Sequence, residues 1–273
     1  MNNIVDWNEI WKLGHSGTPP SSDPWKNRAE HFERHIKSLS GVADEMIARF
    51  QCKPTDTVLD IGAGTGRYAI PVAKQVAFLT AIEPSATMRT MLKSKQAEHG
   101  ISNMEIISHP WEDIIVGKDI QPHDIVIASH SFTMHDVKEA IIKMHQAAKR
   151  EFWFILFAGK KMESWVRDAL RKAEIDAGFE QRPFDYLIIY SILHSLGLYA
   201  DVHISAYEFF ETYPDVETAV QDWKLMYDVP SENEIFTQEI TRRLICTDEG
   251  FALPRTSRIA AIHWHVSSAT HHD

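Results

Sequence analysis

The chain has few cysteines and lacks any long apolar run. Only Cys52 and Cys246 occur among its 273 residues, and their spacing fits neither a disulfide framework nor a zinc site. No stretch approaches the roughly 20 apolar residues that a membrane-spanning helix needs. The first residues also lack the basic region and apolar core of a secretory signal. These absences predict a cytoplasmic protein in a reducing compartment, without a membrane span.

Positive charge is also scarce. The formal net charge is −10, and the basic pairs Lys160-Lys161 and Arg242-Arg243 are isolated. Proteins that bind nucleic acids usually present a basic face, because contacts to phosphates supply most of their affinity. The acidic balance therefore argues against a nucleic-acid partner. Apolar content of 44% and charged content of 24% are ordinary for a globular protein of one large domain.

Histidines are plentiful, but their spacing does not indicate a metal. The best helical pair is His31 and His35, and the best strand pair is His263 and His265. Neither pair has the cysteine or acidic neighbours that usually complete a ligand set. We therefore predict that the protein holds no metal.

The segment from Val58 to Tyr68 carries the clearest motif of the chain. A short apolar run containing Asp60 leads into Gly62, Gly64 and Gly66, and a helical pattern follows. A buried strand that opens into a glycine loop at a helix N-terminus is typical of a nucleotide site. Glycines let the backbone approach the ligand closely, and we expect free N–H groups of the loop to point at it.

The acidic residues around this loop indicate which nucleotide it binds. A dinucleotide fingerprint reads G-x-G-x-x-G, whereas the spacing here is G-x-G-x-G. Asp60 would repel a pyrophosphate and suits a ligand with a cationic end. Glu83 ends the next apolar run, 21 residues after Gly62, where an acid binds the ribose in such units. Ribose hydroxyls donate hydrogen bonds, and one carboxylate can accept two of them.

At these residues the chain resembles the class I S-adenosylmethionine (SAM)-dependent methyltransferases. It is most similar to the small-molecule branch related to quinone-biosynthesis methyltransferases, of type 11 or type 25. The resemblance covers residues 25–158 and includes the Trp25–Phe32 pattern, which is similar to the helix before the core in that family. It implies an enzyme that transfers a methyl group from SAM to a small-molecule acceptor, leaving S-adenosylhomocysteine.

The order of sequence patterns fits this resemblance. We expect an α/β fold with a doubly wound, mostly parallel, seven-stranded Rossmann-like sheet. The parts would be a helical cap over residues 1–50, a SAM-binding core over 51–160, and a C-terminal part over 161–273, all in one structural domain. The last part would complete the sheet and insert helices over the substrate. Its expected strands are Leu198–Phe210 and Arg258–Val266, and the helices between them are Val216–Tyr227 and Glu234–Ile245.

The cofactor contacts follow from the motif and the resemblance. Met88 could lie on one face of the adenine, or it could be a core methionine. In the resembled family an acid after the third strand accepts from the adenine amino group, and either Glu112 or Asp113 fits that role. The predicted cofactor-binding set is Asp60, Gly62, Ala63, Gly64, Gly66, Glu83, Pro84, Met88, Trp111, Glu112, Asp113 and Ser129.

Catalytic and substrate residues are less clearly marked. His130 follows the fourth strand, where the family places the transferred methyl, and an imidazole can accept a proton near neutral pH. It could equally be a hydrogen-bonded structural histidine. A flat or apolar substrate would suit aromatic side chains on the expected caps, although such side chains often serve packing alone. The predicted substrate-binding set is Trp7, Trp11, His130, Tyr186 and Tyr190.

Two other functions remain as alternatives. A non-catalytic SAM-binding or sensor protein would show the same motif, since no residue is clearly an essential base. A nicotinamide-dependent oxidoreductase would need the other glycine spacing and gives Asp60 no role. The sequence does not identify the acceptor atom or the oligomeric state, and a homodimer is compatible with it.

Overall fold

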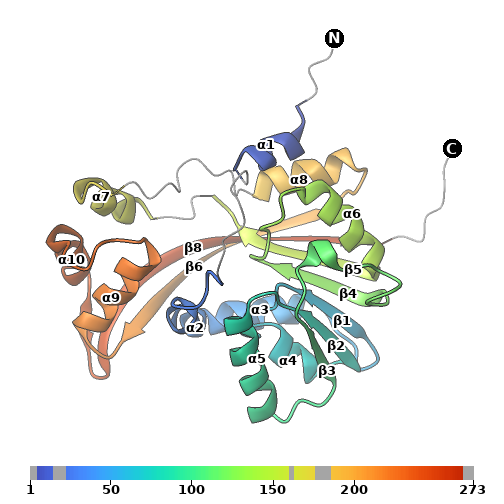
Figure 1. The fold of residues 1–273 in the computed structure, drawn as a ribbon, viewed down its shortest axis with the longest axis horizontal. Helices are drawn as coiled ribbons and strands as arrows, with labels where there is room; N and C mark the ends of the chain where they lie inside the picture. Colours follow the sequence, from blue (N-terminus) through green and yellow to red (C-terminus); the bar gives the residue numbers. More distant parts are fainter. Residues whose placement is uncertain (1–4, 15–22, 160–162, 176–185, 267–273) are drawn as a thin grey trace.

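The computed structural model describes residues 5–14, 23–159, 163–175 and 186–266. Its centre is a twisted sheet in the order β3-β2-β1-β4-β5-β8-β6, with helices on both faces (Figure 1). The order reverses between β1 and β4, and ligands of open α/β sheets bind outside the carboxyl ends of the strands at such a point. The glycine loop follows β1 and therefore lies at this position.

Five parallel strands form the first part of the sheet: β1 (Thr57–Ile61), β2 (Phe78–Ile82), β3 (Met104–Ile107), β4 (His123–Ser129) and β5 (Ala148–Phe157). Their side chains alternate between two cores, because successive residues of a strand point to opposite faces. On β4, for example, Val126 and Ala128 enter one core while Ile125 and Ile127 enter the other. Burial on both faces explains why these segments are nearly continuous apolar runs.

The helices of this part are α4 (Ala69–Ala73), α5 (Ala86–Glu98) and α6 (Val137–Ala147), with a short 3₁₀ turn over Trp111–Asp113. Two of them begin at residues whose side chains accept from the first turn: Ser85 from the Met88 N–H, and Asp136 from the Glu139 N–H. Capping therefore fixes where α5 and α6 begin.

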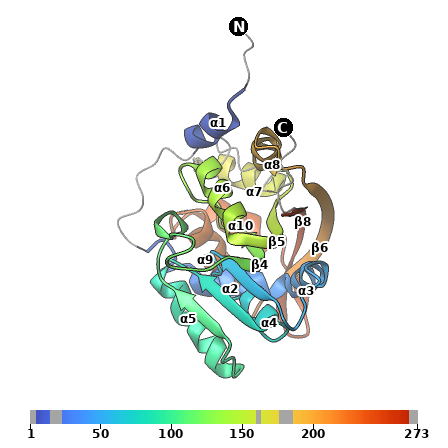
Figure 2. The same cartoon turned by 90° about the vertical axis from the view of Figure 1, so that its right-hand side faces the viewer.

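Three helices precede the sheet: α1 (Trp7–Gly14), α2 (Ala29–Ser38) and α3 (Ser40–Arg49). The α1 helix lies on the same side of the sheet as α6 and as α8 (Tyr186–Ser195), as Figures 1 and 2 show. It is held there by Trp11, whose buried indole N–H donates to the Met134 carbonyl at 2.9 Å. The α3 helix belongs to the core on the opposite face.

The C-terminal part adds a long antiparallel ribbon of β6 (Asp201–Tyr213) and β8 (Gly250–His265), paired from Asp201–His263 to Tyr213–Phe251. The ribbon extends beyond the sheet and carries a third core (Figure 1). We call this region the second lobe: the far ends of β6 and β8 with α7 (Ser164–Lys172), α9 (Val216–Met226), α10 (Glu234–Thr241) and β7 (Ile245–Thr247). No helix in the described part of the chain has the length and apolar character needed to cross a bilayer.

The expected α/β fold is confirmed, and the helical pair α9 and α10 lies between β6 and β8 as expected. Three details were wrong. The strand expected over Leu198–Phe210 runs from Asp201 to Tyr213 as β6. The helix expected to reach Ile245 ends at Thr241, and Ile245 instead begins β7, an eighth strand that pairs with β8 outside the main order. The last strand begins at Gly250 rather than Arg258, because pairing with β6 extends it through a stretch that is not continuously apolar.

Candidate functional site

The three glycines of the loop after β1 occupy positions that exclude other residues. Gly62, Gly64 and Gly66 have φ angles of 74°, 58° and 90°, in the left-handed region that favours glycine. A Cβ on Gly62 would stand 2.2 Å from the Ser131 Cβ, and one on Gly66 would stand 2.5 Å from a Leu92 methyl group. The loop is therefore pressed closely between α5 and the segment that follows β4.

Four N–H groups of the loop, those of Gly62, Ala63, Gly64 and Gly66, are bonded within the protein, so the expectation of free N–H groups was wrong for these four. Gly62 and Ala63 both donate to the Ile82 carbonyl, at 2.7 and 3.0 Å, and Gly66 donates to the Ala63 carbonyl at 2.9 Å. Gly64 donates to Glu83 at 2.8 Å. These bonds tie the loop to the end of β2. Its glycines therefore serve close approach of the backbone rather than anion binding.

Two buried carboxyl groups lie at this loop. Asp60 is 2% exposed and Glu83 is 5% exposed. Burial raises the pKa of Asp60 to about 7, and the charge of Glu83 adds to this shift. Burial also raises the pKa of Glu83, although hydrogen bonds from the N–H groups of Ser85 and Gly64 oppose it. The site thus holds two acids whose charged forms need a cationic group or hydrogen-bond donors.

Several buried polar atoms near the loop have no hydrogen-bond partner within the described part of the chain. They include one oxygen of Asp60 and the hydroxyls of Thr65 and Ser131. Buried polar groups in folded proteins are nearly always hydrogen-bonded, so each such group calls for an explanation. A polar ligand bound against the glycine loop would supply these partners. The residues present therefore fit a ligand with a cationic end and several donors.

His130 lies where the sequence predicted, directly after β4 and next to the loop. Its φ of 51° is left-handed, which is uncommon for a residue with a side chain. Its N–H donates to the Ile155 carbonyl at 2.9 Å, and its Nδ1 lies 3.1 Å from the Ser129 hydroxyl. The exposed ring meets Phe157 edge to face at 4.4 Å. The structure therefore presents an imidazole beside the glycine loop, and its role in catalysis stays a prediction.

The residues predicted to enclose the adenine lie on α5 and in the loop after β3. Met88 is buried on α5. Trp111 is buried with its indole N–H donating to the Ala140 carbonyl, while Lys143 donates to the carbonyls of Trp111 and Glu112. This loop is thus anchored on α6. The side chains of Glu112 and Asp113 are both exposed, so the choice between them stays open.

The predicted substrate residues lie on α1 and α8, which pack against one another over the core that contains Phe132. Trp11 is 1% exposed and meets Phe132 edge to face at 6.4 Å, so its ring is part of the protein interior. Trp7, Tyr186 and Tyr190 are half-buried at the rim of that core. Their contact with a substrate stays a prediction.

Sequence reasoning missed three residues at this site. Asp23 accepts hydrogen bonds from the Ser85 hydroxyl and from the Thr87 N–H, each at 2.9 Å. It therefore anchors the segment that follows Glu83. Phe32 on α2 lies 3.8 Å from where a Cβ on Gly64 would stand. Tyr68 is buried behind the loop, and burial raises its pKa. The Trp25–Phe32 pattern pointed to the helix that contains Phe32, but no pattern marked Asp23.

Known proteins are similar in sequence and in fold to the part of the chain that contains the glycine loop. Residues 58–151 match the profile of a methyltransferase domain family. An uncharacterised protein of Haemophilus influenzae is 25% identical over 191 residues, which cover 69% of this chain and 68% of that one. An uncharacterised methyltransferase of Alkaliphilus oremlandii is 26% identical over 187 residues, covering 64% of this chain and 78% of its own.

Solved structures show the same fold at low identity. The YcgJ protein of Bacillus subtilis has a TM-score of 0.53 and 18% identity, covering 81% of this chain and 97% of that one. A candidate methyltransferase from Bacillus halodurans has a TM-score of 0.58 and 12% identity, covering 82% of this chain and 98% of its own. The match places a methyltransferase domain at residues 58–151, and together with the paired acids at the glycine loop it supports methyl transfer from S-adenosylmethionine by this chain.

Proposed function

We propose that this methyltransferase acts on a small molecule, held beside the carboxyl edge of β4 and β5 beneath α1 and α8. The position of α1 carries this proposal. Its Trp11 hydrogen-bonds to Met134 in the segment after β4, so a helix covers the side of the site where the acceptor would lie. The acidic net charge also supports a small acceptor over a nucleic acid.

Asp60 and Glu83 are the residues proposed to hold SAM. Asp60 would face the amino group of its methionine part, because a buried carboxyl with an unpaired oxygen is stabilised by a cation. Glu83 would take the ribose, and the residues around Met88 and Trp111 would enclose the adenine. The bound cofactor supplies an electrophilic methyl group. The chain then has to align the acceptor and exclude water, and such positioning can lower a barrier by roughly 7–11 kcal/mol.

His130 is the group proposed to accept a proton from the acceptor. It is exposed at the edge of β4, beside Ser131, whose Cβ lies against Gly62. Its ring contact with Phe157 and its bond to Ser129 hold the imidazole in one orientation. A hydroxyl acceptor would need such a base, whereas a thiolate or an activated carbon would not.

The finer assignments belong to the same proposal. Residues 1–50 would act as a cap, 51–160 as the cofactor core, and 161–273 as the part that completes the sheet and covers the acceptor. A reducing, cytoplasmic location is supported by Cys52 and Cys246, which are both free.

Calorimetric titration tests the cofactor assignment directly. The purified protein would be titrated in parallel with SAM, S-adenosylhomocysteine and NAD. Micromolar binding of the first two, without a response to NAD, is expected. Binding of NAD alone would show that the glycine loop has been misassigned. A protein that binds SAM but methylates none of a broad panel of small acceptors would favour a sensor instead.

A further inference from the structure

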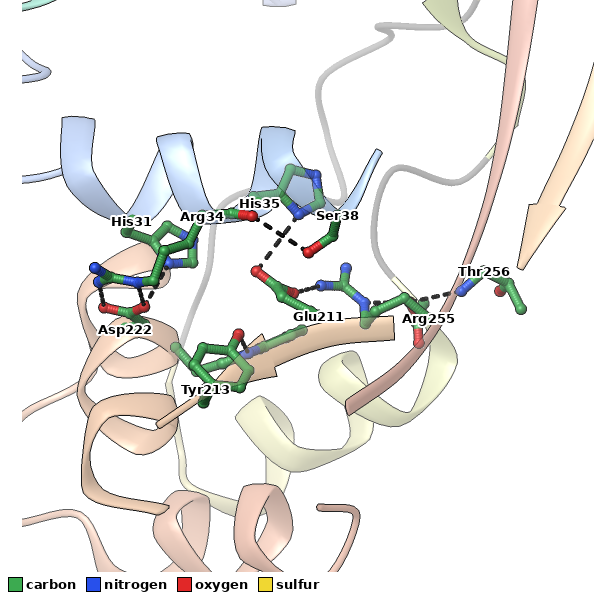
Figure 3. Close-up of polar contacts among 11 residues, drawn as sticks. His31, Arg34, His35, Ser38, Glu211, Tyr213, Asp222, Arg255 and Thr256 are labelled. Carbon is green, nitrogen blue, oxygen red and sulfur yellow. Dashed lines mark hydrogen bonds and ion pairs between the residues drawn. The ribbon is translucent and has the colours of Figure 1, made fainter. Parts of the chain in front are cut away.

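A set of polar and charged side chains joins α2 to the second lobe (Figure 3). Arg34 on α2 donates twice to Asp222 on α9, from Nε at 2.7 Å and from Nη2 at 2.5 Å. The Nδ1 of His31, one turn earlier on α2, lies 3.3 Å from the same carboxylate. Asp222 is 6% exposed, so its carboxylate is largely removed from water, while the side chain of Arg34 is 35% exposed.

A second connection starts one residue later on α2. The Nδ1 of His35 lies 3.5 Å from Glu211 on β6, which is completely buried. Arg255 on β8 donates to the other oxygen of Glu211 at 2.7 Å and to Glu163 at 2.6 Å. The guanidinium of Arg255 also lies 4.5 Å above the ring of Trp223 on α9. The pair of Glu211 and Arg255 thus lies at the centre of the polar contacts of the second lobe. His35 lies next to Glu211 and brings α2 against this pair.

The opposite end of this connection is the glycine loop. Phe32 lies on α2 between His31 and Arg34, with its ring 3.8 Å from where a Cβ on Gly64 would stand, and the ring packs at a tilt against Trp25 with the centroids 4.9 Å apart. Glu33 pairs with Lys95 on α5 at 2.5 Å. The α2 helix therefore lies beside the glycine loop and also pairs with the second lobe.

The local sequence of α2 does not fix its position. The helix has ten residues and no side-chain cap at Arg28. Isolated helices of this length are marginal in water, so contacts with neighbouring elements decide where such a helix lies. Buried ion pairs add little net stability, but they demand one particular arrangement of the elements that carry them. The pairs to Asp222 and Glu211 are therefore suited to fixing one placement of α2.

We propose that Arg34 and His35 are positioning residues of the cofactor site, which through Asp222 and Glu211 hold α2, and Phe32 with it, over Gly64. The inference rests on the proposed function, because it assigns α2 a part in retaining SAM. It also gives the second lobe a role in cofactor binding, at a distance from the glycine loop.

The test compares Asp222→Asn with wild type for binding of S-adenosylhomocysteine. The variant keeps the size of the side chain and removes the charge that Arg34 and His31 face. We expect its Kd to rise about fivefold or more, the lower end of usual coupling between sites. Hydrogen exchange of the ligand-free protein gives a readout independent of the ligand. Amides of residues 29–38 and 62–66 should exchange faster in the variant.

Arg243→Gln is the matched control. Arg243 pairs with Glu239 inside the second lobe at 2.7 Å and stacks on Trp165, without a contact to α2 in the structure. It should lower the free energy of unfolding in urea while leaving the Kd within twofold. Arg34→Gln combined with Asp222→Asn should be no worse than the worse single variant, because both remove one connection.

The outcomes separate the positioning role from the proposed function. Wild-type protein that fails to bind S-adenosylhomocysteine overturns both. Wild-type binding with an unchanged Kd and unchanged exchange in Asp222→Asn overturns the positioning role alone. The same holds if Arg243→Gln weakens binding as much as Asp222→Asn does, since the effect would then follow from general destabilisation.

Discussion

At the scale of single residues, the site depends on one buried acid. Asp60 lies on β1 with an oxygen that lacks a partner among the described residues, and burial followed by the charge of Glu83 raises its pKa to about 7. The group is therefore half protonated at neutral pH in the free protein. A cationic ligand group favours the carboxylate, so ligand binding and proton release must be linked.

Affinity for S-adenosylhomocysteine should therefore depend on pH. The carboxylate fraction of Asp60 grows as the pH rises through about 7, so the Kd should fall by roughly tenfold between pH 6 and pH 8. Asp60→Asn should bind more weakly at pH 8 and show a flat profile. Calorimetry in two buffers with different heats of ionisation would also detect the released proton. A flat profile in wild type would remove Asp60 from the amino group of the ligand.

The same group should limit the stability of the ligand-free protein. Its folded pKa of about 7 lies above the ordinary 3.8, so the folded state binds more protons between these values and stability falls as the pH rises through them. At pH 8 this loss is on the order of 4 kcal/mol. Asp60→Asn should therefore unfold at higher urea than wild type at pH 8, and at similar urea at pH 4. Equal midpoints at pH 8 would contradict the raised pKa.

Gly62 should be the most sensitive position of the loop. Gly62→Ala places a Cβ 2.2 Å from Ser131 at a φ of 74°, so the segment carrying His130 must move. Gly117→Ala is a matched control, because Gly117 also has a positive φ of 88° but nothing within 4 Å of an added Cβ. The control should cost about 1 kcal/mol of unfolding free energy from backbone strain alone. Gly62→Ala should cost more and also weaken cofactor binding; equal losses would contradict the close packing.

At the scale of elements, the parallel strands and their helices were readable from the sequence because local rules specify them. The apolar run that Glu83 ends is β2 (Phe78–Ile82), and the run is apolar because the sheet is covered on both faces. The ribbon of β6 and β8 was predicted only in part. Glu211 is completely buried on β6, yet nothing local marks it, because its partner Arg255 lies 44 residues away. The pattern of apolar and polar residues alone would predict that such a glutamate is exposed.

The placement of the site was predicted on the same grounds. Strand order and the glycine loop bring Asp60, Glu83 and His130 to one edge, because each of the three lies in or directly after a parallel strand. The hydrogen bonds of Asp23 could not be predicted, because its partners Ser85 and Thr87 lie more than 60 residues further along the chain. The prediction of free N–H groups was wrong for Gly62, Ala63 and Gly64, because the Ile82 carbonyl and the Glu83 side chain accept hydrogen bonds from them.

The second lobe should lose stability in acid through Glu211. Burial works to raise the pKa of this carboxyl, but His35 and Arg255 outweigh it and lower the pKa to about 2. A folded pKa below the ordinary 4.5 stabilises the protein above pH 4.5, and this contribution is lost as the pH falls toward 2. Glu211→Gln should therefore cost about 3 kcal/mol or more at pH 7, since it leaves Arg255 buried with one partner fewer. Urea unfolding at pH 7 and pH 3 would check this, and a gap that does not narrow at pH 3 would contradict it.

At the scale of the whole molecule, two regions share one sheet. The loops proposed to bind the cofactor lie at the carboxyl edge of β1, β2 and β4, while the ribbon of β6 and β8 extends into the second lobe (Figures 1 and 2). The α2 helix lies beside the glycine loop at Phe32 and pairs with Asp222 and Glu211 of the second lobe. Ligand binding at the glycine loop should therefore also reduce local opening in the second lobe.

Hydrogen exchange with and without ligand would measure how far this effect extends. At one hundred times its Kd, S-adenosylhomocysteine should stabilise the protein by about 2.7 kcal/mol through mass action. Amides of residues 58–66 should slow most. Because α2 links the loop to α9, amides of residues 216–226 should slow as well, and they should slow less in Asp222→Asn. Protection confined to the core in wild type would mean that the ribbon and α2 transmit no coupling, and that the second lobe only packs against the cofactor domain.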